Sequence, residues 1–351
     1  MKYKKILINC IRILFILGMI VFINRLFMPK YVEDNQDGCV TQEFYLQKTK
    51  LDVLAFGSST VYNAISPDFL WKEYGFTSYT RANASQTLWQ SYYLMEDALK
   101  TETPDLILVD MSFMKYGEEF VEEPSNRKAI DGMRLSTSKW NCIKASMGEE
   151  EPITYLFPIF RYHSRWKELT AKDLQYTFRM PEVTYDGYIM QFDIPEEQII
   201  YEKEAKENYE FPQKAWEYLD KITELCKEKN VPLLLMKTPT YVNNWYDEYD
   251  EMLSQYASSK GIKYTNFDNY KVQMGNNLRL HYVDDGSHLN VVGAEVFSKF
   301  LGAYITEQYD IKNHSHDKKY QDIWDKKLER YEVNKAVGMK KYEEKRKSLG
   351  L

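Results

Sequence analysis

Two short segments of the chain hold residue types that together could act as a hydrolytic or acyl-transfer site. The first is Gly57-Ser-Ser-Thr60, and the second, far downstream, is Asp285-Gly-Ser-His288. A serine hydroxyl becomes an effective nucleophile when a histidine takes its proton, and a carboxylate orients that histidine. The two segments therefore indicate nucleophilic chemistry if the fold brings them together.

The elements around the two segments are suited to presenting such side chains. The apolar run Val53–Phe56 predicts a short buried strand that ends at Gly57. Glycine permits a tight turn from strand to helix, which lifts the following hydroxyl out of the sheet edge. Downstream, Asp285 and His288 are three residues apart in one short loop before a helix-like segment, so that loop could present a base with its orienting carboxylate. Each motif alone is weak, and their combination is more specific.

These residues resemble a known family. Gly57-Ser-Ser-Thr60 resembles the Gly-Asp-Ser-Leu block of the SGNH/GDSL hydrolases, and Asp285-Gly-Ser-His288 resembles their final Asp-x-x-His block, with Ser58 in place of the usual aspartate. The resemblance covers residues 52–304 and implies Ser59 as nucleophile, His288 as base and Asp285 as orienting carboxylate. The chain looks most like the membrane-anchored branch, which includes the D-alanyl-lipoteichoic acid transfer protein and partners of polytopic O-acyltransferases.

The family's two other blocks, which supply oxyanion donors, are altered in this chain. Asn83 and Ser85 stand in the place of the second block without its glycine, so the backbone at Ser85 is the best candidate donor. The third block should supply an asparagine after Val109, but the chain has Ser112 in that region, which could replace it only in part. Loss of one oxyanion donor costs about 2.7–4 kcal/mol of transition-state stabilisation. Another group must therefore substitute, or the chemistry is slow or needs a partner.

Apolar strands alternate with helices along the chain, which is typical of a parallel sheet covered on both faces. We predict a three-layer α/β/α fold, which the resemblance makes an SGNH-like (flavodoxin-like) parallel sheet. Loops at the carboxyl edge of such a sheet form the site, and Thr238 lies in one of them. The predicted strands are 53–56, 77–81, 104–110, 231–237 and 263–267, and the predicted helices are 66–74, 88–99, 202–229, 245–260 and 291–305.

A long insertion at about 116–198 interrupts this alternation and contains an aromatic, basic stretch at 155–166. One interpretation is a lid or substrate platform. Arg161 and Arg165 would then bind a phosphate or carboxylate of a polymer, because guanidinium groups suit these anions. His163 is an alternative proton carrier. The other interpretation is internal packing with salt bridges.

The N-terminus predicts a membrane anchor. Lysines precede an apolar run at 6–28, which is long enough to cross a bilayer. No Ala-x-Ala cleavage pattern follows, so we expect an uncleaved signal-anchor with a cytoplasmic N-terminus and an extracytoplasmic domain. A cytosolic amphipathic helix is the alternative. The predicted organisation is anchor (1–30), tether (31–50), α/β domain (51–309) and charged helical tail (310–351), which either packs on the domain or contacts a membrane or partner.

Charge and cysteine content exclude several functions. The chain has 46 basic and 52 acidic residues, and residues 1–30 contain six of the basic ones and no acid. The remaining domain is therefore acidic, which argues against nucleic acid as a partner. The four cysteines lack metal-type spacing, and His314 with His316 alone makes no metal site. We expect neither a metal nor another cofactor.

The sequence leaves two main functional hypotheses. The first is a membrane-anchored serine acyltransferase or esterase acting on a cell-envelope glycan or teichoic acid, with acetyl or D-alanyl groups supplied by a membrane O-acyltransferase, as the resemblance implies. The second is a non-catalytic accessory protein that binds the polymer or the membrane partner. A cytosolic lipase-type hydrolase is a third possibility that requires the N-terminal helix not to span a membrane.

Overall fold

The computed structural model of the protein describes residues 2–29, 39–180, 182–197, 202–242 and 244–351. The first part of the predicted tether and the end of the predicted insertion near 198 lie outside the described residues.

Five parallel strands form one sheet in the order β2-β1-β3-β4-β5 within the described part of the chain. The strands are β1 (Val53–Gly57), β2 (Ser78–Ala82), β3 (Leu106–Asp110), β4 (Leu233–Lys237) and β5 (Lys263–Asn266). The chain moves from β1 to one side and then crosses back to β3, so the strand order reverses between β1 and β3. In open parallel sheets, ligands bind outside the carboxyl ends of the strands at such a reversal. Ser59 follows β1 at this point.

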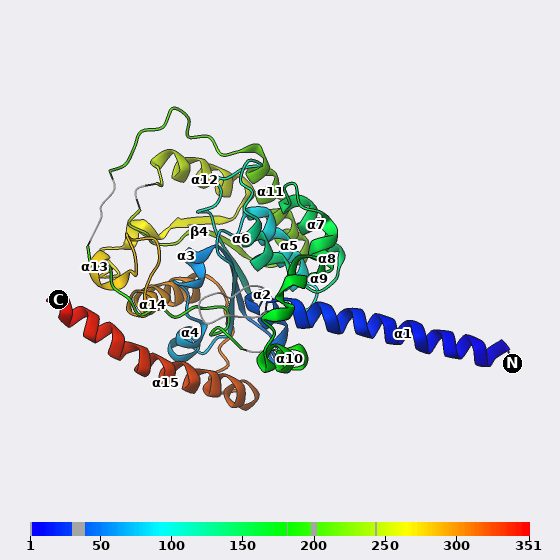
Figure 1. Ribbon diagram of the computed structural model, residues 1–351. Coiled ribbons are helices and arrows are strands. Elements are labelled where there is room, and N and C mark those ends of the chain that lie inside the picture. Colours follow the sequence, from blue (N-terminus) through cyan, green and yellow to red (C-terminus); the bar gives the residue numbers. More distant parts are fainter. Residues whose placement is uncertain (1, 30–38, 181, 198–201, 243) are drawn as a thin grey trace.

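Helices cover both faces of the sheet, as predicted (Figure 1). Alternate side chains of the strands supply two apolar cores: Leu54 and Phe56 belong to one, and Val53 and Ala55 belong to the other. The first core is covered by α5 (Leu88–Ala98), α7 (Thr137–Ser146), α11 (Gln213–Lys229) and α12 (Asp247–Lys260). The second is covered by α3 (Ser59–Tyr62), α4 (Pro67–Tyr74) and α14 (Val291–Gln308). The protein is therefore a three-layer α/β structure.

Most predicted boundaries agree with the structure within three residues, and two segments differ more. The helix expected at 202–229 begins only at Gln213, because Pro212 cannot donate a backbone hydrogen bond and disfavours helix before it. Part of the expected tether is helical, and Phe44 there packs into the core. The remaining elements are α2 (Cys39–Glu43), η1 (Phe44–Leu46), α6 (Glu123–Ile130), α8 (Pro152–Leu156), α9 (Ile159–Tyr162), η2 (His163–Lys167), α10 (Ala171–Phe178), η3 (Phe267–Tyr270) and α13 (Leu278–His281).

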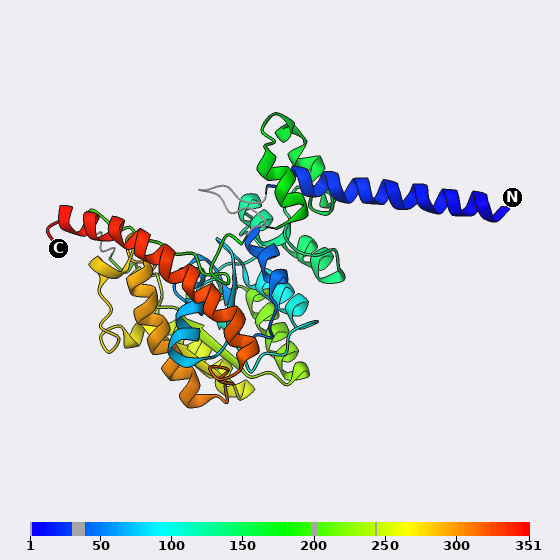
Figure 2. The same cartoon turned by 90° about the horizontal axis from the view of Figure 1, so that it is seen from below.

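Helix α1 (Lys2–Phe27) projects away from the domain beside α9 and α10 (Figures 1 and 2). Its mean hydropathy over the most apolar window is 2.7, and that window is not buried against the protein. A long helix whose apolar window is not covered by protein is characteristic of a membrane span, and 26 residues exceed the length needed. The helix is thus long and apolar enough to cross a membrane.

Helix α15 (Lys318–Ser348) lies along the domain as a 31-residue helix. It packs through Trp324, Tyr331 and Tyr342, which are buried. The Trp324 indole donates to the Thr49 hydroxyl at 3.0 Å, and the Tyr331 hydroxyl donates to Glu295 at 2.7 Å. Packing of the tail on the domain by its aromatic stripe is therefore confirmed.

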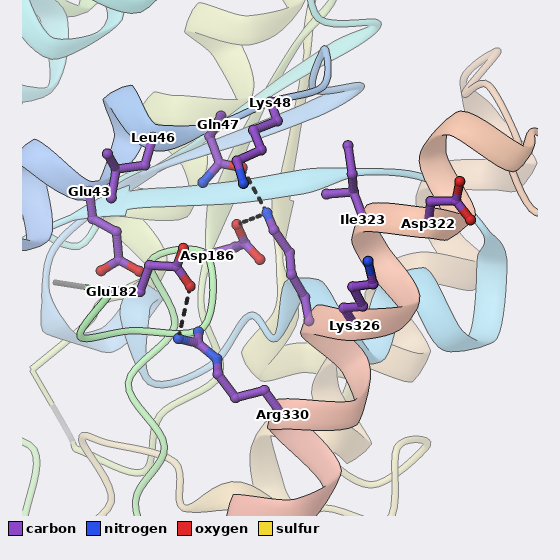
Figure 3. A pocket seen from close by; sticks show the side chains of 11 residues that line it. Glu43, Leu46, Gln47, Lys48, Glu182, Asp186, Asp322, Ile323, Lys326 and Arg330 are labelled. Atoms are coloured by element: carbon purple, nitrogen blue, oxygen red, sulfur yellow. Dashed lines mark hydrogen bonds and ion pairs between the residues drawn. The ribbon is translucent and has the colours of Figure 1, made fainter. Parts of the chain in front are cut away.

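A cavity of about 230 Å³ lies between η1, the segment around residue 186 and α15 (Figure 3). Lys327 from α15 reaches Gln47 at 2.8 Å and Asp186 at 2.6 Å across it. Glu43 is buried at its wall and accepts hydrogen bonds from the backbone and hydroxyl of Thr184. Ser59 and His288 do not line this cavity. The contacts of Lys327 across it hold the C-terminal helix against the domain.

The buried Glu43 predicts a pH-dependent stability. Burial raises the pKa of Glu43 from 4.5 to about 7, although hydrogen bonds from Thr184 oppose the shift. The folded state therefore holds the proton more tightly than the unfolded state, and stability is lost as pH rises from 4.5 to 7, by up to about 3 kcal/mol. We expect Glu43→Gln to raise the thermal unfolding midpoint of the detergent-solubilised protein more at pH 8 than at pH 5. An equal effect at both pH values would contradict this.

Candidate active site

The structure brings Ser59 and His288 into direct contact. The Ser59 Oγ lies 2.7 Å from Nε2 of His288, and the other ring nitrogen, Nδ1, lies 2.5 Å from Oδ2 of Asp284. This is the order of contacts in a serine–histidine–aspartate triad: hydroxyl, imidazole, carboxylate. All three side chains are partly accessible. A reactant could therefore reach the hydroxyl while the histidine holds its proton-accepting nitrogen against it.

The orienting carboxylate is Asp284, and the prediction of Asp285 is wrong. Asp284 Oδ1 accepts three backbone N–H groups, from Gly286 (3.1 Å), Ser287 (2.8 Å) and His288 (3.0 Å). The turn thus wraps around this side chain and leaves Oδ2 facing the imidazole. Gly286 has a φ of +102°, a conformation that glycine adopts easily and that lets the loop close around Asp284.

The hydrogen bonds around Asp284 also keep it ionised. Burial raises the pKa of this carboxyl, but the hydrogen bond and charge of His288 and the backbone N–H groups of His288 and Ser287 outweigh burial, so its pKa is lowered overall. An ionised carboxylate accepts the Nδ1–H of the imidazole and stabilises the imidazolium that forms when Nε2 takes a proton. The charge state of the pair is therefore suited to general-base catalysis.

The turn before Ser59 depends on Gly57. A Cβ at Gly57 would lie 2.4 Å from Cγ2 of Val61 and 2.9 Å from Cβ of Asp110, so a side chain cannot fit without displacement. This close approach lets α3 begin immediately after β1. Ser58 is buried and its Oγ lies 3.1 Å from the Thr60 hydroxyl, whereas Ser59 is accessible. Of the two serines, only Ser59 contacts the histidine in the described structure.

Asp110, at the end of β3, connects the polar groups beneath the Ser59 turn. Its Oδ2 accepts the Thr60 hydroxyl at 3.2 Å. Its Oδ1 accepts the Ser112 hydroxyl at 3.1 Å and the Thr238 N–H at 3.0 Å. Thr238 therefore lies at the same edge of the sheet as the Ser59 turn. Ser112 is there too, but its hydroxyl donates to Asp110 and must rotate before it can serve an oxyanion.

The segment after β2 contains the other two predicted pocket residues. The Asn83 amide is buried, donating to Gln86 at 2.8 Å and accepting from the Thr41 hydroxyl at 3.3 Å, so its role here is to hold the turn. Ser85 has a φ of +52°, which marks a tight turn at the carboxyl end of the strand next to β1. Its backbone N–H stays a candidate oxyanion donor by position.

Two residues with shifted pKa values were missed in the sequence: Tyr62, which contacts Ser59, and Lys115, which interacts with the charge of Asp110. Burial raises the pKa of Tyr62, one turn after Ser59 in α3, to about 12 despite a hydrogen bond with Ser59, so its hydroxyl remains a donor at neutral pH. Burial lowers the pKa of Lys115 to about 8, and the charges of Lys237 and Lys206 add to this effect. The position of Tyr62, three residues after the serine on a short helix, was the available signal. No local signal marks Lys115.

The three basic residues of the insertion make contacts elsewhere. Arg161 pairs with Glu123 at 3.1 Å, and Arg165 contacts Asp173 at 3.0 Å and donates to the Phe27 carbonyl of α1 at 2.6 Å. His163 Nδ1 lies 3.2 Å from the Phe160 carbonyl. These contacts agree with the alternative of packing and salt bridges, and they join the insertion to α1. The described contacts do not link these residues to Ser59 or His288.

Among the described residues, no group of three or more histidine, cysteine or acidic side chains could hold a metal ion. Cys142 and Cys226 are free thiols buried in the core. Comparison with protein-family models gives no match for this chain, and comparison with curated proteins gives none either.

Proposed function

We propose that the protein is a membrane-anchored, extracytoplasmic serine acyltransferase or esterase of the SGNH type that acts on a cell-envelope polymer. The contact of Ser59 Oγ with His288 Nε2, backed by Asp284, supports this function most directly. The strand order 2-1-3-4-5 is the flavodoxin-like order expected for that family, and the nucleophile lies at its switch point. Both features agree with the resemblance at the two end motifs.

The reaction proceeds in two steps. The Ser59 Oγ attacks the acyl carbonyl carbon while Nε2 of His288 takes the hydroxyl proton, and the C–O bond to the leaving group breaks as the imidazolium returns that proton to it. A hydroxyl of a glycan or teichoic acid, or water, then attacks the acyl-serine and transfers its own proton to His288. The Ser59 oxygen takes this proton back when the acyl group leaves.

The negative oxygen of the tetrahedral intermediate needs hydrogen-bond donors. The Tyr62 hydroxyl, which stays protonated at neutral pH, and the backbone N–H of Ser85 are the donors we assign to it. A tyrosine donor would compensate for the asparagine missing after Val109. The site thus replaces the usual donors of the family with groups from α3 and the segment after β2.

The proposed membrane anchoring depends on α1. Lysines before the apolar helix favour a cytoplasmic N-terminus and an extracytoplasmic domain. The acyl group, acetyl or D-alanyl, would be supplied across the membrane by an O-acyltransferase. The polymer that receives it would be an envelope glycan or teichoic acid.

A non-catalytic accessory role is the second candidate. It is favoured by Ser112 and Asn83, whose side chains are already hydrogen-bonded to Asp110, Thr41 and Gln86. An accessory protein of this kind would bind the polymer or the membrane O-acyltransferase through the same edge of the sheet.

A fluorophosphonate probe separates the two candidates. An activated serine displaces fluoride from such a probe and forms a stable phosphonate ester. We expect the full-length protein to be labelled stoichiometrically, with the modified peptide assigned to Ser59 and not to Ser58. Absence of labelling in the folded protein would favour the accessory role.

A further inference from the structure

The membrane-proximal end of α1 is held by the insertion. Residues 2–21 of α1 are exposed all round, whereas residues 22–27 are partly covered by α9, η2 and α10. Three contacts fix this arrangement. The Ile159 N–H donates to Asn24 Oδ1 at 3.1 Å, Arg165 donates to the Phe27 carbonyl, and the rings of Phe22 and Phe178 are 5.9 Å apart. We call the segment 159–178 the collar.

The collar exposes large apolar side chains next to the helix that it holds. Phe160 is 58% exposed, Trp166 64%, Leu174 49% and Phe178 75%. Large exposed apolar patches rimmed by polar residues mark sites of interaction with proteins or membranes. Figure 2 shows α10 and its neighbours standing off from the sheet as a lobe around the base of α1. The apolar side chains are therefore grouped where the chain leaves α1.

Basic residues accompany these rings. Arg161, Lys167 and Arg179 are exposed in or beside the collar, and the Lys167 ammonium lies 5.3 Å from the centre of the Trp166 ring. Tryptophan flanked by lysine or arginine is the composition found at the headgroup level of a bilayer. Anionic headgroups would attract the exposed cations.

The length of α1 that the collar leaves uncovered also indicates contact between the collar and lipid. The uncovered segment 6–21, which is apolar apart from Asn9 and Arg12, rises about 24 Å at 1.5 Å per residue. The hydrocarbon core of a bilayer is about 30 Å thick. A span that ends at the collar is therefore short by about 6 Å. Insertion of the collar's side chains into the boundary between headgroups and acyl chains removes this mismatch.

We propose that the collar is a lipid-binding surface: Phe160, Trp166, Leu174 and Phe178 enter the outer part of the bilayer beside α1, while the basic residues contact anionic headgroups. This surface would fix the height and tilt of the domain above the membrane, which a flexible tether would not do. This inference rests on α1 spanning the bilayer and is independent of the chemistry at Ser59.

Tryptophan quenching by lipid tests the proposal, because α1 contains no tryptophan. The full-length protein is placed in nanodiscs of phosphatidylcholine and phosphatidylglycerol whose acyl chains are brominated near the glycerol. We expect bromolipid to quench part of the tryptophan emission of the wild type. The Trp166→Phe variant should lack this quenched component. Trp216→Phe, on α11, is the matched control and should still show the quenched component.

A second pair of variants tests for a gain of lipid quenching. In the Trp166→Phe background, Phe178→Trp should restore quenching, whereas Val272→Trp should not. Val272 is 94% exposed between η3 and α13, which lie on the side of the domain opposite α1 in Figure 1. Equal quenching of the wild type and Trp166→Phe would overturn the proposal and favour a protein partner as the occupant of the collar. Failure of the protein to enter nanodiscs would overturn it as well, and Ser59 labelling would be unaffected.

Discussion

Replacement of Ser59 by alanine is expected to lower the rate of ester cleavage by about 10⁴- to 10⁶-fold. Loss of the nucleophile in a serine–histidine–aspartate site leaves only the catalysis that comes from binding and oxyanion donors. The Ser59 Oγ is the atom that contacts His288, and the methyl group of an alanine would leave the imidazole without a hydrogen-bond partner on that side. The measurement is kcat/KM of the full-length protein with an activated acetyl ester, together with the acyl content of the cell envelope.

Ser58→Ala is the matched control for this prediction. The Ser58 hydroxyl is buried and contacts Thr60, and a neutral hydrogen bond of this kind contributes about 1 kcal/mol. Its loss should change the rate by less than about tenfold. If Ser59→Ala retained wild-type activity, the triad would have no catalytic role, and the accessory function would account better for the chain.

The pairing of Ser59 with His288 was predictable from sequence because each residue belongs to a local pattern. A glycine and two hydroxyls after a buried strand mark the Ser59 turn, and the histidine before α14 marks the second loop. Strands β1, β3 and β4 were predictable for the same reason, since each is a largely apolar run. Strands β2 and β5 contain polar and charged residues, so their prediction depended on the alternation with helices. The contact between the two loops follows from parallel strands that end at one edge.

The orienting carboxylate could not be chosen from sequence alone. Two adjacent aspartates, Asp284 and Asp285, precede Gly286, and both are close enough in sequence to reach the histidine. The choice depends on which side chain the backbone wraps around, and three N–H groups of the turn select Asp284. The family's Asp-x-x-His spacing favoured the wrong one.

The hydrogen bonds of the predicted pocket residues involve partners that are distant in the sequence. Asn83 is held by Thr41, 42 positions earlier, and Ser112 shares Asp110 with Thr238. The role of the insertion was hidden for the same reason: Ile159 contacts Asn24, 135 positions earlier. Contacts over such separations leave no periodic or local signal, so composition alone left both a substrate platform and internal packing with salt bridges open.

Replacement of Asp284 by asparagine is expected to lower kcat/KM by about 10⁴-fold, the size of effect seen when the triad carboxylate becomes an amide. The asparagine Oδ1 can still accept the three backbone N–H groups, so the turn should survive. Its Nδ2, however, would donate toward His288 Nδ1 and force the ring proton onto Nε2. That tautomer cannot accept the Ser59 proton. The measurement is kcat/KM with the activated ester, with circular dichroism to check folding.

Asp285→Asn is the matched control, because it makes the same chemical change one residue away. The carboxylate against the imidazole is that of Asp284, so the Asp285 variant should stay within about tenfold of the wild type. The Asp284 variant should also lose fluorophosphonate labelling, since the serine is no longer activated. The reverse result, with activity lost in Asp285→Asn and kept in Asp284→Asn, would mean that the working enzyme uses the loop in another conformation. The spacing of the family motif would then describe the site better than the geometry of this turn.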